Sequence, residues 1–366
     1  MRRISMDHVT DAMEIVDLFT HPAFCVTDGI ITKVNTAAQM RMIEAGTAIT
    51  DLIKDGAEEY FEFFDGCLYL TLRICDTDLG FSVIRRNGFD LFRLEQDAQN
   101  EELQAMALAA RELREPLASI MISANHLFPS SVDPEDSKVC EQMTRINRGL
   151  FQMLRLISNM SDANRYASST PVSMEVKNIV ALLDEIFHKA SGYVEQAGLR
   201  LEYTGLQEEI YCPVNQELLE RAALNAVSNA LKFTPAGGVI QVRVSHRNSK
   251  LYLSIQDNGA GIPEQLRGTL FSRYSREPGV EDGRFGIGLG FVIIRSAAAQ
   301  HSGTVLVDHP QGCGTRITLT LSTRPGSGTT LHSPVLRVDY AGERDHGLLE
   351  LSDVLPASLY DNQQIH

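Results

Sequence analysis

The sequence predicts a multidomain α+β protein. Three parts are expected: a small α/β domain over residues 12–92, an antiparallel helical hairpin over 93–168, and an α/β sandwich over 170–322. A linker and C-terminal tail follow over 323–366. The observations behind this are a β-hairpin signal near the start, heptad spacing in the middle, and alternating helices and strands afterwards. A chain of 366 residues has room for two or three domains.

The first part carries a strong hairpin signal. Apolar runs at 23–26 and 30–34 flank Asp28 and Gly29, and a short helix is expected after Asn35. Two further strand-like runs follow at 68–74 and 80–85. This order resembles a PAS domain, a fold that is sensory in many proteins. A plain dimerisation or spacer domain is the alternative. The sequence does not identify a ligand for this domain.

The middle part shows two apolar stripes with alternating steps of three and four residues, which is the spacing of helices that pack in bundles. The stripes consist of Leu103, Met106, Ala110, Leu113, Leu117, Ile120, Ala124 and Leu127, and of Val139, Met143, Ile146, Leu150, Met153, Ile157 and Met160. Between them, Asp133 is expected to cap a helix that has Pro134 at its first position. Two helices alone would leave much of these stripes exposed, so we expect a homodimer in which two hairpins form a four-helix bundle.

Composition excludes several classes of protein. The net charge of −14 argues against nucleic acid as the main partner. No apolar run is long enough to cross a bilayer, and the N-terminus lacks the apolar core of a signal peptide, so a cytoplasmic protein is expected. The six cysteines are scattered without a Cys-x-x-Cys pair, which suggests neither a zinc site nor a disulfide framework.

The third part contains three separated motifs suited to a nucleotide. In the first, Asn225 and Asn229 lie four residues apart on an expected helix and so share one face, with Lys232 about one turn further on. An amide oxygen suits Mg²⁺, which usually also keeps waters and phosphate oxygens, and a lysine attracts phosphate as a point charge.

The other two motifs are rich in glycine. Asp257 ends an apolar strand and offers an acceptor to an exocyclic amine such as adenine N6, while Gly259 and Gly261 let a base approach the backbone. Gly286, Gly288 and Gly290 open an apolar helix, whose N–H groups favour anionic phosphate. Each motif alone has a plainer explanation: a solvated helix face, a turn, or a loop.

In this order and spacing the motifs resemble the N, G1 and G2 boxes of the histidine-kinase-like ATPases. The resemblance implies binding of ATP and Mg²⁺, with Asn229 as the magnesium ligand. Between the second and third motifs, Phe271 and Arg273 resemble the F box and the mobile lid of that family. There Phe271 would anchor the lid by packing and Arg273 would face phosphate; simple core filling and a solvated side chain are the alternatives.

The segment 110–117 resembles the H box of sensor histidine kinases, with one departure. Arg111 stands where the family has its phosphoacceptor histidine, and Glu112 stands where the family has a glutamate that polarises it. A guanidinium stays protonated and has no lone pair for attack on phosphorus. Arg111 is therefore either a solvated residue or a contact to phosphate or to the ATP domain.

The resemblance covers roughly residues 93–322 and implies a two-component sensor protein whose autophosphorylation is in doubt. A response regulator or a partner kinase is the implied partner. One alternative is an inactive pseudokinase that acts as an ATP-gated scaffold. The other is a serine-directed kinase of the same ATPase superfamily.

Overall fold

The computed structural model describes residues 15–86, 88–95, 108–110, 112–113, 117–118, 120, 137–167, 172–263, 267, 270–271, 288–310, 314–324 and 345–361.

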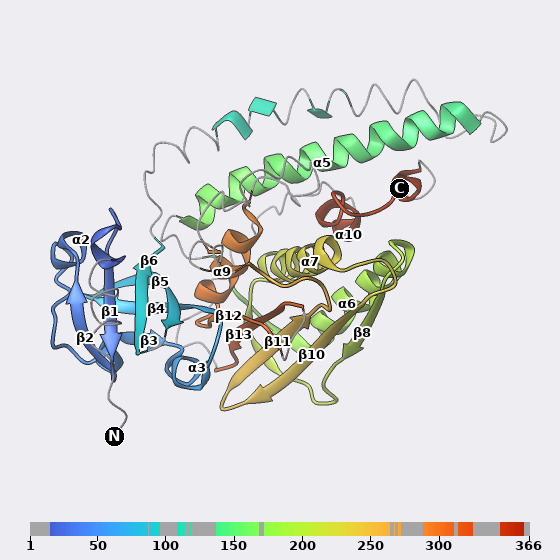
Figure 1. The fold of residues 1–366 in the computed structure, drawn as a ribbon. Coiled ribbons are helices and arrows are strands. Elements are labelled where there is room, and N and C mark those ends of the chain that lie inside the picture. Colours follow the sequence, from blue (N-terminus) through green and yellow to red (C-terminus); the bar gives the residue numbers. More distant parts are fainter. Residues whose placement is uncertain are drawn as a thin grey trace.

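The N-terminal unit is an antiparallel sheet crossed by short helices (Figure 1). Its elements are β1 (Ala23–Thr27), β2 (Ile30–Val34), α2 (Thr36–Gln39), η1 (Ile49–Asp51), β3 (Ile53–Asp55), α3 (Ala57–Glu62), β4 (Cys67–Ile74), β5 (Thr77–Arg86) and β6 (Phe89–Leu94). Asp28 and Gly29 both have positive φ, at 51° and 77°, which explains why the β1–β2 turn uses this pair. The strands lie in the order β2-β1-β6-β5-β4, and the stacked rings of Phe24 and Phe92 form the centre of the core.

Asn35 fixes the start of α2 against the sheet. Its Oδ1 accepts hydrogen bonds from the N–H groups of Ala38 at 2.9 Å and Ala23 at 3.2 Å, and its Nδ2 donates to the carbonyl of His21 at 2.8 Å. One buried amide thus caps a helix and ties it to β1, as expected for asparagine at an N-cap.

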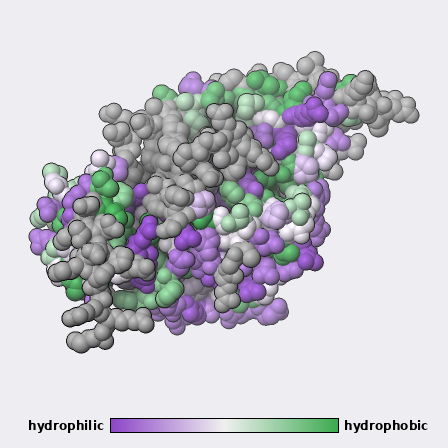
Figure 2. All heavy atoms as spheres, in the orientation of Figure 1, coloured by the Kyte–Doolittle hydropathy of each residue, from purple (hydrophilic) through white to green (hydrophobic). Residues whose placement is uncertain are grey.

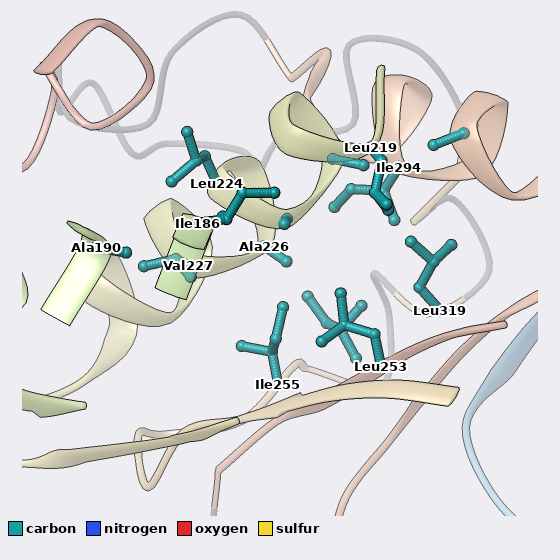
Figure 3. Close-up of a cluster of buried hydrophobic side chains, with 14 of the residues drawn as sticks. Ile186, Ala190, Leu219, Leu224, Ala226, Val227, Leu253, Ile255, Ile294 and Leu319 are labelled. Atoms are coloured by element: carbon teal, nitrogen blue, oxygen red, sulfur yellow. The ribbon is translucent and has the colours of Figure 1, made fainter. Parts of the chain in front are cut away.

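The C-terminal unit is a mixed sheet covered by helices on one face, with β7 and β9 paired in a separate two-stranded sheet. Its elements are β7 (Glu175–Asn178), α6 (Ile179–Gln196), β8 (Arg200–Thr204), β9 (Tyr211–Val214), α7 (Gln216–Phe233), β10 (Val239–Arg247), β11 (Lys250–Gln256), α9 (Gly290–Gln300), β12 (Val305–Asp308) and β13 (Arg316–Ser322). Figure 3 shows Ala226 and Val227 of α7 on the side of the helix that faces Leu253 and Ile255 of β11. The alternation of buried residues along β10 and β11 produces this apolar layer.

The two units share one continuous sheet of 11 strands. Strand β12 pairs with β4 in antiparallel register, with Val305 opposite Tyr69. Gly66 is required at this junction, because a Cβ there would lie 2.0 Å from the carbonyl oxygen of Val307. Beside the junction, Glu59 of α3 accepts from Lys250 at 2.8 Å. The N-terminal unit is thereby attached to the sheet that carries the nucleotide motifs.

A long helix and the C-terminal segment lie above this sheet (Figure 1). The helix is α5 (Ser137–Ala167), and the segment of residues 345–361, which we call the tail segment, contains α10 (His346–Glu350) and η3 (Ala357–Tyr360). The tail segment lies between α5 and α7, with the ring of Tyr360 5.2 Å from that of Phe151.

The apolar stripe of α5 divides into two sets. Met143, Leu150 and Ile157 are buried, whereas Ile146 and Met153 are 42% and 44% exposed. Figure 2 shows hydrophobic spheres along the upper edge of the molecule, where α5 runs. None of the helices in the described part of the chain is long and apolar enough to cross a lipid bilayer.

Most of the expected elements are confirmed. The β1–β2 hairpin, the short helix after Asn35 and the mixed sheet with its helices are all present. The sequence prediction missed β3, α3 and β6, and it missed the pairing of β4 with β12. The turn with Asp133 and Pro134 lies outside the described residues, as does most of the first hairpin helix.

Candidate nucleotide site

Helix α7 carries the first motif and is buried along two faces. Its apolar residues cover the sheet, and a second stripe faces α5 and the tail segment. That stripe consists of Arg221, Asn225, Ser228 and Lys232, spaced three or four residues apart. Polar side chains on a buried helix face need partners, and here the partners come from other elements.

The two asparagines of the first motif lie beside the third motif. A Cβ added to Gly290 would be 3.3 Å from Oδ1 of Asn225 and 3.9 Å from Nδ2 of Asn229. Gly288, two residues earlier, has φ of +75°. The glycine run therefore brings the N-terminus of α9 directly against α7, where an exposed N–H would face the asparagine amides.

Nδ2 of Asn229 is one of seven buried side-chain polar atoms without a hydrogen-bond partner among the described residues. Leaving a buried amide unpaired costs about 1–3 kcal/mol, so such groups usually have a ligand or water to satisfy. Because Nδ2 is a donor, the group that it lacks is an acceptor such as a phosphate oxygen, and the magnesium ligand that the sequence predicts at this position would be Oδ1.

The second motif contacts the C-terminal end of α7. A Cβ on Gly259 would lie 2.2 Å from the carbonyl oxygen of Phe233, so the turn and the helix meet with no room for a side chain. Oδ1 of Asp257 accepts from the N–H groups of Gly259 at 2.8 Å and Thr315 at 3.1 Å. Burial raises the pKa of the Asp257 carboxyl, and these two N–H groups partly offset the effect. The carboxylate is thus held in one orientation.

Lys232 lies on the last turn of α7, and its Nζ is 3.3 Å from Oδ2 of Asp353. Burial, and then the positive charge of Arg155, lower the pKa of Lys232 to about 8, although Asp353 opposes the shift. A lysine held this way is a cation enclosed by protein rather than by water.

Phe271 is fully buried. Its ring lies 5.7 Å from that of Tyr69 on β4 and 5.8 Å, edge to face, from that of Phe291 on α9. The aromatic residue of the lid motif therefore packs between the N-terminal unit and the helix that follows the third motif. The packing agrees with both of the sequence alternatives, an anchor and core filling.

Comparison with known proteins bears on this arrangement of motifs. Residues 214–325 match the family model described as "Histidine kinase-, DNA gyrase B-, and HSP90-like ATPase", a range that contains all three motifs. The chain is 26% identical over 325 residues to "Adaptive-response sensory kinase SasA" of Crocosphaera subtropica, which covers 84% of this chain and 85% of that protein. Residues 214–325 belong to this ATPase family, and the chain as a whole is similar to sensor histidine kinases.

Other members of the histidine kinase family match over a smaller share of their length. "Histidine protein kinase DivJ" of Caulobacter vibrioides is 28% identical over 244 residues, which is 65% of this chain and 40% of that protein. Among solved structures, "ShkA full-length in complex with AMPPNP" aligns at 22% identity with a TM-score of 0.48, over 60% of this chain and 45% of that one.

The described residues of this histidine kinase relative fit the nucleotide and magnesium that the family implies. Asn229 has an amide oxygen that suits Mg²⁺ and an unpaired amide nitrogen that can donate to a phosphate oxygen. Asp257 has a fixed carboxylate that can accept from a base, and Gly290 puts no side chain between α9 and Asn225. One feature opposes immediate entry: Oδ1 of Asn225 already accepts from Arg155 at 3.2 Å.

Some predicted site residues cannot be placed. Arg111, Arg273 and Gly286 lie outside the described residues. Glu112 is described, and it is exposed on a helical segment. Gly261 has φ of +79°, and a Cβ there would lie 3.0 Å from the ring of His309, so the turn needs glycine at this position as well.

Sequence reasoning missed the buried charges around α7. They are Arg221 on the helix itself, Arg155 on α5, and Glu350 and Asp353 in the tail segment. Arg221 is fully buried within a helix, where arginine is rare unless paired. A signal did exist in the tail, where Glu350 and Asp353 interrupt an otherwise apolar run at a spacing of three residues. Acidic residues at helical spacing among leucines indicate buried charge that needs a basic partner.

Proposed function

We propose that this chain is a sensor protein of the two-component type that binds Mg·ATP along α7. The observation that carries the proposal is the meeting of three motifs, distant in sequence, around one helix that also holds the unpaired amide of Asn229. If the three motifs were only a solvated helix face, a turn and a loop, nothing would require them to lie together in the fold.

The site divides into two ends. The base end consists of Asp257, Gly259 and Gly261, where the fixed carboxylate would accept from the exocyclic amine of adenine. The phosphate end consists of Asn225, Asn229, Lys232, Gly288 and Gly290. There Asn229 would hold Mg²⁺, and Lys232 and the N-terminus of α9 would face phosphate oxygens.

The proposal extends to what the nucleotide does. Because Arg111 stands at the acceptor position of the H box, the usual attack of an imidazole on the γ-phosphorus has no nucleophile. Glu112 likewise has no imidazole proton to accept. We therefore assign ATP the role of setting the conformation of a regulatory module, which is the pseudokinase form of the family.

Two partners follow from this role. The exposed Ile146 and Met153 alternate with buried residues on the stripe of α5, which supports a second copy of the chain as the partner of the hairpin. A response regulator or a partner kinase would receive the output.

Incubation of the purified chain with γ-labelled ATP and Mg²⁺, with nucleotide binding measured in parallel, tests the proposal. Binding without covalent label is the expected result. Acid-labile label on the chain would show a kinase with an unusual acceptor, and acid-stable label on an added partner would show serine transfer. Absence of binding would remove the proposal altogether.

A further inference from the structure

The tail segment carries two carboxylates into the stripe of α7 that faces it. Glu350 is fully buried, and its Oε1 accepts from Nε of Arg221 at 2.8 Å while its Oε2 accepts from Nδ2 of Asn225 at 3.0 Å. Oδ2 of Asp353 lies 2.7 Å from Arg155 and 3.3 Å from Lys232. Two residues of the phosphate end, Asn225 and Lys232, are therefore held by the chain's own acidic groups.

Charge explains why these carboxylates are stable there. Arg155, Arg221 and Lys232 bring three positive charges to one buried stripe, and the tail segment supplies two negative charges against them. Without the tail segment, three cations and an asparagine amide would face the same space. That set of donors matches an anion with several oxygens, and phosphate oxygens and carboxylate oxygens use the same charge-assisted hydrogen bonds.

Asn225 shows the conflict with a metal nucleotide most clearly. Its amide oxygen accepts from a guanidinium nitrogen of Arg155 at 3.2 Å, and its amide nitrogen donates to Glu350. A divalent cation near that oxygen would meet the positive charge of Arg155 at close range, and γ-phosphate oxygens would meet the charge of Glu350. Like charges at such distances in a buried site are strongly unfavourable.

Contacts to α5 hold the tail segment in this position. Arg148 donates to the carbonyls of Ser352 at 3.2 Å and Asp353 at 3.1 Å, and Asn147 donates to the carbonyl of Tyr360 at 3.0 Å. Tyr360 is buried against Phe151. The tail segment thus bridges the hairpin helix and the nucleotide helix, and its departure would leave only the direct contacts between them, such as Arg155 with Asn225.

We propose that the tail segment is a built-in ligand of the phosphate end, in which Glu350 and Asp353 occupy the positions of phosphate groups and compete with Mg·ATP. The inference rests on the proposed function, since it needs a nucleotide that binds at α7. Binding of the nucleotide displaces the tail segment and removes its bridge between α5 and α7, which converts occupancy of the pocket into a change in the hairpin.

The test compares nucleotide affinity in full-length chains. Titration with a fluorescent Mg·ATP analogue is made for the wild type, for Glu350→Gln with Asp353→Asn, and for Asp361→Asn. Asp361 is a matched control because it is an exposed carboxylate in the same segment. We expect the double variant to bind at least tenfold more tightly than the wild type, and the control to behave as the wild type.

A second measurement needs no substitution. Amide hydrogen exchange of α10 in the wild type, followed at Leu349 and Leu351, which donate to the carbonyls of Asp345 and Gly347, is compared with and without saturating Mg·AMPPNP. Because coupling between two ligands is reciprocal, the nucleotide should speed this exchange by the factor that the double variant gains in affinity.

The outcomes separate the two proposals. Equal affinity of the wild type and the double variant, with exchange in α10 unchanged by nucleotide, would overturn the competition while leaving nucleotide binding intact. Failure of all three chains to bind the analogue would instead remove the proposed function, and the competition with it.

Discussion

The base end and the phosphate end lie along the same helix but are held in different ways. At the base end, backbone N–H groups of Gly259 and Thr315 orient Asp257, and the turn has no room for side chains. At the phosphate end, side chains from α5 and the tail segment form hydrogen bonds with polar side chains of α7. A pocket can thus be preorganised in one half and controlled in the other, because backbone contacts persist while side-chain ion pairs can be exchanged.

The largest expected effect comes from breaking the base end. Asp257→Asn replaces an oxygen that accepts two N–H groups with an amide that can present a donor instead, and it removes the charge that attracts an exocyclic amine. We expect nucleotide affinity to fall at least about 100-fold, or about 3 kcal/mol. Isothermal titration with Mg·AMPPNP measures this.

The control for that substitution is Asp184→Asn, which changes an exposed carboxylate that accepts from Tyr203. It should leave affinity unchanged, and far-UV circular dichroism should show both variants folded. A folded Asp257→Asn chain with wild-type affinity would contradict the assignment of the base end.

A smaller effect is expected at the phosphate end. There the contribution of Lys232 to the free energy of unfolding should change with pH by about 2 kcal/mol. The pKa of Lys232 in the folded chain, about 8, lies below that of an ordinary lysine, so the folded state binds fewer protons than the unfolded state above pH 8. The contribution of Lys232 to stability therefore rises with pH between about 8 and 10, and it falls as pH drops back through 8.

Chemical denaturation of the wild type and Lys232→Met across this range isolates the effect, because other titrating groups are common to both. As pH rises, the free energy of unfolding of the wild type should increase relative to that of the variant. In the background of Glu350→Gln with Asp353→Asn, where the tail segment is released, the gain should shrink. A difference that is independent of pH would show that Lys232 is not enclosed by the tail segment.

The smallest effect is expected from the turn of the base end. Gly261→Ala forces a side chain into φ of +79° and places Cβ 3.0 Å from the ring of His309. The backbone alone should cost about 1 kcal/mol of stability. Gly237→Ala is the matched control, since Gly237 has φ of +76° with nothing within 4 Å of the added Cβ. Thermal unfolding should show a larger loss for Gly261→Ala than for the control, and equal losses would mean that the contact with His309 is unimportant.

The sequence predicted the base end better than the phosphate end, for a physical reason. Asp257 and its glycines form a local turn, and local turns follow from neighbouring residues. The charged network around Asn225 joins α5, α7 and the tail segment across long sequence separations, 70 residues between Arg155 and Asn225 and 125 residues between Asn225 and Glu350. The periodicity of a single segment does not show which distant residue its charged side chains will contact.

The same reasoning applies to the fold. The hairpin at Asp28 and Gly29 and the strands of the mixed sheet were predictable from alternation and turn chemistry. The pairing of β4 with β12 was not, because β4 is apolar on both faces and its second neighbour comes from another part of the chain. Burial on both faces indicates that a strand is covered by other layers, but it does not say which strands pair with its edges.

Binding of Mg·AMPPNP to the full-length chain carrying Glu350→Gln and Asp353→Asn, measured by titration with and without Asp257→Asn, tests the central claim most directly. The account predicts saturable binding of one nucleotide per chain, lost when Asp257 is changed. No binding at millimolar nucleotide, or binding that is indifferent to Asp257, would contradict a nucleotide pocket along α7.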